Sequence, residues 1–236
     1  MKSTIVFAGP SISRERIRAI TTTVRIEDPI RRGDMQRLAE FDTFVILDGE
    51  FGQSLSVSPK EILDVIDAGK TVIGASSMGA LRASELDCYG MTGIGWVYRR
   101  FARARVRRDD EVALVFSPFD FTPVTIPMVC VEYWLEVLLD ESVLAPKEAR
   151  AISKAVGKVF FADRTEAAVL KTVVSVAGTD ALGRMLACTG GAIPDIKALD
   201  AEEAIRTACG TGLVTGRKDD VQSSKKGRTE QYARAI

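Results

Sequence analysis

The chain has 236 residues, of which 46% are hydrophobic, so it is long enough to bury a sizeable core. Lysine plus arginine number 32, as do aspartate plus glutamate, and this balance excludes the strongly charged character typical of proteins that bind nucleic acid or membrane surfaces. The chain has no histidine and its four cysteines form no CxxC pair. We therefore expect no metal site and free thiols in a reducing, cytoplasmic compartment.

The first half of the chain has the pattern of an α/β protein. The apolar run that begins at Thr4 stops after five residues, too short for a signal peptide or a membrane span. Runs of β-branched residues at 4–8, 21–26, 43–47 and 71–74 alternate with helical patterns, and a further strand is predicted over 112–116. This alternation favours a parallel sheet with helices on both faces, a three-layer arrangement.

Two polar features at the ends of these elements can be interpreted from local rules. Ser58-Pro59-Lys60-Glu61 is a capping box, with proline at the helix position that needs no N–H donor. Asp48 follows the third strand, and a carboxylate just past the end of a buried strand lies where open α/β sheets place ligands. The alternative for Asp48 is a turn aspartate beside Gly49.

Residues 71–86 predict a short strand, a tight turn and a helix, with Ser77 on the turn. The pattern small-x-Ser-x-Gly, here with Ala75 and Gly79, bends the chain sharply enough to present an exposed hydroxyl above the sheet edge. The N–H of Met78, with a second donor near Gly49, would then face an oxyanion. The candidate oxyanion and substrate-binding residues are Met78, Gly49, Asp48, Ser76, Arg82 and Glu85. The alternative is an ordinary corner of an α/β unit.

The remainder of the chain is expected to be mostly helical. The basic cluster from Arg99 to Arg108 is followed at once by Asp109-Asp110-Glu111, which fits either a solvated helix or a docking face for an acidic protein. Residues 90–95 are glycine-rich but follow a helix, so we interpret them as a loop. The predicted division is an α/β core domain over 1–122, a helical portion over 123–216 and a flexible basic tail over 217–236.

Several separated segments coincide with one family pattern: Gly9-Pro10-Ser11, Pro29 with Arg32-Gly33-Asp34, Asp48-Gly49-x-Phe51, Lys60-Glu61-Ile62-Leu63, Gly74 to Leu86, Gly90-Met91-x-Gly93 and Asp109-Asp110-Glu111-Val112-Ala113. The sequence resembles the TfuA-like family over about residues 4–116, and the helical portion carries no matching motif. The resemblance implies an accessory protein of backbone thioamidation on ribosomally made peptides. The implied partners are a YcaO-type ATP-dependent cyclodehydratase or thioamide synthetase and a ubiquitin-like sulfur carrier that ends in a glycine thiocarboxylate.

The resemblance further implies an enzyme that hydrolyses this thiocarboxylate and releases sulfide, and Ser77 is suited to such acyl transfer. Members of the family often carry histidine before Lys-Glu-Ile-Leu and after Asp-Asp-Glu-Val-Ala, where this chain has Pro59 and Phe116. Without histidine a Ser-His-Asp triad is excluded, so the base must be a lysine or a carboxylate. Lys60 is the first choice, and Glu61 or Asp48 is the second.

Two other functions compete with a serine hydrolase. A non-catalytic adaptor would bring the carrier and the YcaO enzyme together, and a Ser77 hydroxyl buried against apolar side chains would favour it. A nucleotide-binding module would use 74–79 as a phosphate nest, but the glycine and lysine positions of a phosphate loop are absent. We therefore expect no cofactor.

Overall fold

The computed structural model describes residues 3–52, 54–104 and 109–210. They form two compact units, one containing the residues up to Pro123 together with the segment from Ile196, and the other containing Val124–Asp195. The chain thus leaves the first unit, builds the second, and returns to the first with its last described helix.

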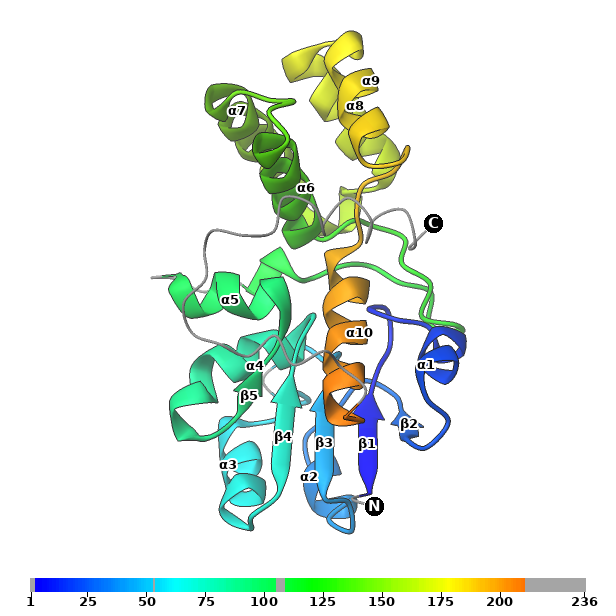
Figure 1. Ribbon diagram of the computed structural model, residues 1–236, viewed down its shortest axis with the longest axis vertical. Helices are drawn as coiled ribbons and strands as arrows, with labels where there is room; N and C mark the ends of the chain where they lie inside the picture. Colours follow the sequence, from blue (N-terminus) through cyan, green and yellow to red (C-terminus); the bar gives the residue numbers. More distant parts are fainter. Residues whose placement is uncertain (1–2, 53, 105–108, 211–236) are drawn as a thin grey trace. The chain divides into compact units, whose positions relative to one another are not determined.

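The first unit is built on a five-stranded parallel sheet (Figure 1). Its strands are β1 (Thr4–Phe7), β2 (Arg25–Glu27), β3 (Thr43–Ile46), β4 (Thr71–Gly74) and β5 (Thr92–Gly93). They lie in the order β2-β1-β3-β4-β5, and every neighbouring pair is parallel. The order reverses direction between β1 and β3, and in such doubly wound sheets ligands bind beyond the carboxyl ends of the strands at this reversal.

Helices cover both faces of the sheet, so the predicted α/β three-layer arrangement is confirmed. The helices of this unit are α1 (Arg14–Ile20), α2 (Asp34–Arg37), α3 (Pro59–Asp67), α4 (Met78–Leu86), α5 (Gly95–Arg103) and α10 (Ile196–Ala208), with short 3-10 turns η1 (Asp87–Tyr89) and η2 (Asp109–Glu111). Side chains of α2, α3 and α4 pack against one face of the sheet. Those of α1 and α10 pack against the other face.

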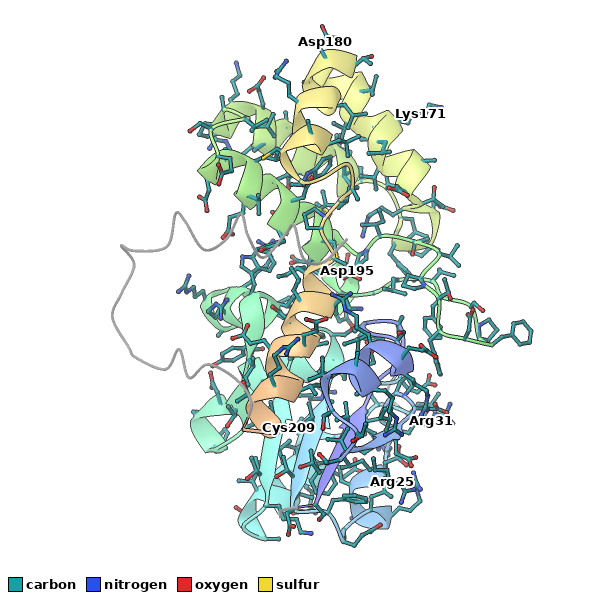
Figure 2. The ribbon with its side chains drawn as sticks, turned by 45° about the vertical axis from the view of Figure 1, so that its right-hand side comes forward. Arg25, Arg31, Lys171, Asp180, Asp195 and Cys209 are labelled. Carbon is teal, nitrogen blue, oxygen red and sulfur yellow. The ribbon has the colours of Figure 1, made fainter. Side chains whose placement is uncertain are left out.

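Helix α10 belongs to the sheet unit, although the sequence assigns residues 196–208 to the helical portion. Ala201, Ala204 and Ile205 pack against the sheet residues Val45 and Ile73, and all five side chains are buried. Figure 2 shows α10 between the labelled Asp195 and Cys209. The alanines let the helix approach the sheet closely, because they add little bulk between the two backbones.

The second unit is helical, as expected. It contains α6 (Met128–Asp140), α7 (Pro146–Val156), η3 (Phe161–Asp163), α8 (Glu166–Ala177) and α9 (Thr179–Cys188). Trp134 of α6 is fully buried, and Ile152, Val169, Val173 and Met185 from the other helices share its cluster. This unit therefore has its own apolar core. The predicted tail over 217–236 lies outside the described residues.

Two local predictions differ from the fold. Within the predicted loop at 90–95, Thr92–Gly93 pairs with β4 and becomes the edge strand β5. The predicted strand at 112–116 does not form; Phe116 makes only an isolated antiparallel bridge with Pro123. Strand pairing depends on which segment reaches the open edge of the sheet, and that is a tertiary matter. In the part of the chain that is described, no helix is long and apolar enough to cross a membrane.

Candidate active site

The turn between β4 and α4 is set by close backbone contacts. The Ser77 N–H donates to the Leu47 carbonyl at 3.2 Å, and the Gly79 N–H donates to the same oxygen at 3.3 Å. A Cβ atom on Gly79 would lie 1.7 Å from the Ile46 carbonyl oxygen, which is closer than any real contact. Glycine two positions after Ser77 is therefore required, because the first turn of α4 lies directly against the end of β3.

Ser76 and Ser77 differ in backbone and in bonding. Ser76 has a φ of 65°, a left-handed conformation that non-glycine residues rarely adopt, so the strain typical of a nucleophile turn falls one residue before Ser77. The Ser76 hydroxyl donates to the Lys197 carbonyl at 2.8 Å, so its proton is already engaged in a hydrogen bond. Ser77 is the N-cap residue of α4, with φ −130° and ψ −114°, yet its hydroxyl does not cap the helix. Ser77 thus remains the better nucleophile candidate.

The expectation of an exposed hydroxyl is wrong, because Ser77 is only 2% exposed. The neighbouring Ser76 is fully buried and is bonded to the start of α10, so the returning helix encloses this side of the turn. The sequence analysis assigned residues 196–208 to a separate helical portion, so it did not predict that this helix would cover the serine turn.

Asp48 lies at the reversal point of the sheet, where the carboxyl ends of β1 and β3 meet. Its Oδ2 accepts hydrogen bonds from the N–H groups of Gly9 (2.8 Å) and Ser11 (3.0 Å), and its Oδ1 accepts one from the Ser11 hydroxyl (2.6 Å). In the parallel register Ile46 is opposite Gly74, so Asp48 and Ser77 follow aligned strand ends. The prediction that they share the carboxyl edge of the sheet is confirmed.

Lys197 is the site residue that sequence reasoning missed. It lies in the first turn of α10, is 2% exposed, and places its Nζ 3.9 Å from Asp48 Oδ1 and 3.3 Å from the Val112 carbonyl oxygen. A signal was present in the sequence: Lys197 precedes Ala201, Ala204 and Ile205 at spacings of four, seven and eight, which places a lysine on the apolar stripe of the helix. A buried lysine needs a partner, and Asp48 is the nearest carboxylate that the structure pairs with it.

The predicted bases Lys60 and Glu61 lie at the start of α3. Lys60 is exposed, and within the described residues it makes no hydrogen bond or ion pair with Ser77 or Asp48. Glu61 completes the predicted capping box with Ser58, which is confirmed, and also accepts from the Gly33 N–H. Burial alone would raise the pKa of Glu61, but the hydrogen bonds from Ser58 and Gly33 outweigh it and lower the pKa. This bonding favours a capping role.

Arg82 and Glu85 hold α4 to the loop before α3. Arg82 donates to the Val57 carbonyl (3.1 Å) and to the Ser56 hydroxyl (3.0 Å), and it pairs with Glu85 at 2.8 Å. Among the described residues, their partners all lie on this loop or on α4 itself, so the contacts favour a structural role over substrate binding.

Met78 and Gly49 lie together, as the candidate oxyanion site requires. A Cβ atom on Gly49 would be 2.8 Å from Met78 Cγ, so the loop after β3 passes directly over the Met78 side chain. Across residues 3–52, 54–104 and 109–210, neither the Met78 N–H nor the Gly49 N–H has a hydrogen-bond acceptor. Both groups are thus available as donors, which is what oxyanion stabilisation demands.

The basic cluster is only partly described, since residues 105–108 fall outside the described ranges. Arg100 pairs with Glu111 of the acidic triplet at 3.1 Å and stacks over Trp96, while Arg99 and Arg103 are exposed. The pairing agrees with the solvated-helix interpretation for Arg100. Arg99 and Arg103 are exposed, and the hypothesis that they dock an acidic protein stays a prediction.

The beginning of α5 is held by Asp200 of α10. The N–H groups of Trp96 and Val97 both donate to its carboxylate at 2.8 Å, and Gly95, at φ 92°, leaves the space that this carboxylate fills. Burial raises the pKa of Asp200 to about 7, against the two N–H bonds that favour its charged form. Helix α10 therefore supports both the serine turn and the basic helix.

The fold and the site define a doubly wound α/β protein with buried serine, aspartate and lysine side chains at the carboxyl edge of its sheet. The family model described as TfuA-like protein matches residues 48–165, half of the chain. The chain belongs to the TfuA-like family. The match begins at Asp48 and extends to Thr165, so the expectation that the helical portion carries no family pattern is wrong. No curated protein matches the chain. The family is associated with YcaO systems of thioamidation.

Proposed function

We propose that this protein supplies sulfur for thioamidation of a ribosomally made peptide by releasing sulfide from a thiocarboxylated, ubiquitin-like carrier. The observation that carries the proposal is the position of the Ser77 hydroxyl. It lies at the N-terminus of α4 without capping the helix, and Ser77 is at the same carboxyl edge of the sheet as Asp48. Serine at such a helix start is suited to attack a carbonyl carbon, because the adjacent N–H groups stabilise the resulting oxyanion.

The proposed reaction forms an acyl enzyme and then hydrolyses it. The Ser77 hydroxyl loses its proton to a base, and its oxygen bonds to the thiocarboxylate carbon of the carrier. The carbon–sulfur bond then breaks, and sulfur leaves with the proton as hydrogen sulfide ion. Water cleaves the resulting ester and restores the serine. In sum, one thiocarboxylate and one water give one carboxylate, one hydrogen sulfide ion and one proton. A YcaO enzyme would consume the sulfide.

The test uses the full chain with a thiocarboxylated carrier and measures sulfide. We expect Ser77→Ala to lower release by several orders of magnitude, as loss of a nucleophile does. Ser84→Ala is the matched control, because Ser84 is also buried on α4, but its hydroxyl already donates to the Leu81 carbonyl of its own helix. Both variants should keep the wild-type circular dichroism. Wild-type release from Ser77→Ala would refute the covalent mechanism.

A non-catalytic adaptor is the second candidate, and the 2% exposure of Ser77 favours it. In that case the wild type should bind both the carrier and the YcaO enzyme but release no sulfide. Ser77→Ala should then leave both associations unchanged. Replacing the exposed Arg99 and Arg103 with glutamate should weaken them if α5 is the contact, because an acidic partner would meet like charge.

A further inference from the structure

Phe119 is an apolar residue that the fold leaves in solvent. It is 95% exposed, more than any other large apolar residue that the structure describes. It lies in the tight turn between Phe116 and Pro123, which pair as an isolated antiparallel bridge. Single exposed apolar residues are common on protein surfaces, so exposure alone does not define a binding surface. What distinguishes Phe119 is the turn that holds it.

This turn is fixed by hydrogen bonds on both sides of Phe119. The Ser117 N–H donates to the Thr122 carbonyl at 2.9 Å, and the Phe121 N–H donates to the Ser117 carbonyl at 2.9 Å. The Asp120 carboxylate accepts from the Thr122 N–H at 3.1 Å. Phe121 has a φ of 60°, which a bulky residue adopts only where its surroundings impose it. The backbone around Phe119 is therefore already ordered, which lowers the entropy cost of binding a partner there.

The inner side of the turn lies next to the candidate active site. A Cβ atom on Gly9 would be 3.4 Å from Phe121 Cδ1 and 2.6 Å from Pro29 Cγ. The N–H of Gly9 donates to the Asp48 carboxylate at 2.8 Å, at the reversal point of the sheet. Phe119 is two residues from Phe121, and all of these residues belong to the sheet unit. The turn therefore presents Phe119 at the carboxyl edge of the sheet.

A second loop at the same edge also exposes apolar side chains. Phe51 is 39% exposed and Leu55 is 50% exposed, and both lie on the loop after β3. The Arg32 N–H donates to the Leu55 carbonyl at 2.8 Å, which ties this loop to the segment 29–32. The proline of that segment lies beside Gly9, as Phe121 does. We call Phe51, Leu55 and Phe119 the apolar rim.

The charges on these two loops do not favour a polyanion. Residues 116–123 and 49–56 contain no lysine or arginine, and each stretch contains one acidic residue. Glu50, on the loop after β3, pairs with Arg31 at 2.9 Å. The apolar rim therefore offers no basic surface to nucleic acid or to anionic lipid, and it matches an apolar patch on a protein partner.

We propose that the apolar rim is the docking surface for the folded body of the sulfur carrier, with Phe119 as its main contact. The identity of this partner rests on the proposed function. Ser77 is only 2% exposed, so a slender chain end can approach it but a folded domain cannot. The body of the carrier must therefore stay outside the carboxyl edge, where the apolar rim lies, while its tail extends toward Ser77. The YcaO enzyme would use sulfide that has already left, so it needs no contact at this edge.

The test measures binding of the carrier in its carboxylate form, which cannot release sulfide, to the full-length protein by calorimetry. Phe119→Ala should weaken binding about 10- to 100-fold, as loss of an aromatic interface residue does. Leu55→Asp should weaken it too, because it places a charge against an apolar surface. A synthetic peptide of the carrier tail alone should bind the wild type and both variants alike, or none of them.

Phe160→Ala is the matched control, because Phe160 is 62% exposed but lies in the helical unit. It should keep the wild-type affinity. Phe119→Ala should keep the wild-type melting temperature, because the side chain that it removes lies in solvent. Phe119→Trp gives a direct signal of contact. Its fluorescence, compared with that of the wild type, should shift to shorter wavelength when the carrier covers the indole.

The outcomes separate this inference from the proposed function. Wild-type affinity for the carrier in Phe119→Ala or Leu55→Asp overturns the apolar rim as its docking surface, and so does an unshifted Phe119→Trp emission. Binding to the YcaO enzyme or to phosphatidylcholine vesicles that depends on Phe119, with carrier binding unchanged, overturns the carrier as the occupant. Carrier binding that depends on the rim, found without sulfide release from the thiocarboxylated carrier, supports the rim and refutes only the hydrolase. Sulfide release together with carrier binding that is independent of the rim refutes only the rim.

Discussion

The Asp48 carboxylate is the most connected side chain of the candidate site, and its removal should destabilise the sheet unit severely. Asp48→Ala leaves two N–H groups and one hydroxyl without their acceptor. Each buried donor without a partner lowers the free energy of unfolding by about 1–3 kcal/mol. It also leaves the Lys197 ammonium without its carboxylate, and breaking a buried pair typically costs about 3–5 kcal/mol. The total, about 6 kcal/mol or more, is comparable with the whole stability of a domain.

Asp48→Asn should be milder, because one amide oxygen can still accept from the Gly9 and Ser11 N–H groups. It removes the charge opposite Lys197, so we expect a loss of about 2–4 kcal/mol. The assay is urea unfolding of the full chain, followed by hydrogen exchange at the amides of Gly9 and Ser11. Exchange at these two amides reports the sheet unit alone, which is needed because two units need not unfold together.

A loss of less than about 1 kcal/mol in the unfolding free energy of Asp48→Ala would contradict this role of Asp48, since a single lost hydrogen bond would account for that. A double-mutant cycle tests the ion pair separately. Lys197→Met should cost less in the Asp48→Asn background than in the wild type, because the charge it removes has already lost its partner. Additive effects would show that the 3.9 Å pair contributes no coupling.

Three further predictions concern the surrounding scaffold. Gly79→Ala should destabilise the sheet unit by at least about 1–3 kcal/mol, because its Cβ would overlap the Ile46 carbonyl; an unchanged melting temperature would contradict the tight turn. Ser58→Ala should cost about 1 kcal/mol in urea unfolding, through loss of the cap that it forms with Glu61. Asp200 holds its proton more tightly in the folded chain, where its pKa is about 7, than in the unfolded chain, where an aspartate has its ordinary value of 3.8. Its contribution to the free energy of unfolding is therefore complete below pH 3.8 and is lost as the pH rises through about 7. Asp200→Asn should remove that part of the pH dependence of unfolding, and identical pH profiles for variant and wild type would refute the shift.

Much of the scaffold could be predicted because its signals are local. The capping box at Ser58 and Glu61 involves residues three positions apart, so its pattern is readable without a fold. The alternation of β-branched runs with helical patterns likewise predicted the parallel sheet. Parallel strands align their carboxyl ends, so the strand pattern predicts that Asp48 and Ser77 lie at one edge, as they do.

The returning helix α10 decided the rest of the site. Lys197 reaches Asp48 across 149 positions of sequence and bonds to Ser76 across 121, and no local pattern encodes contacts of that range. The same packing buries Ser76, and the turn places the positive φ there instead of at Ser77. Sequence by itself determined the four strands β1 to β4, the cap at Ser58 and the tight glycine turn, because neighbouring residues settle those choices, whereas the edge strand β5 depended on packing. Only the tertiary structure determined that a lysine from the end of the described chain joins the serine and the aspartate, because that depends on how distant segments pack over one sheet.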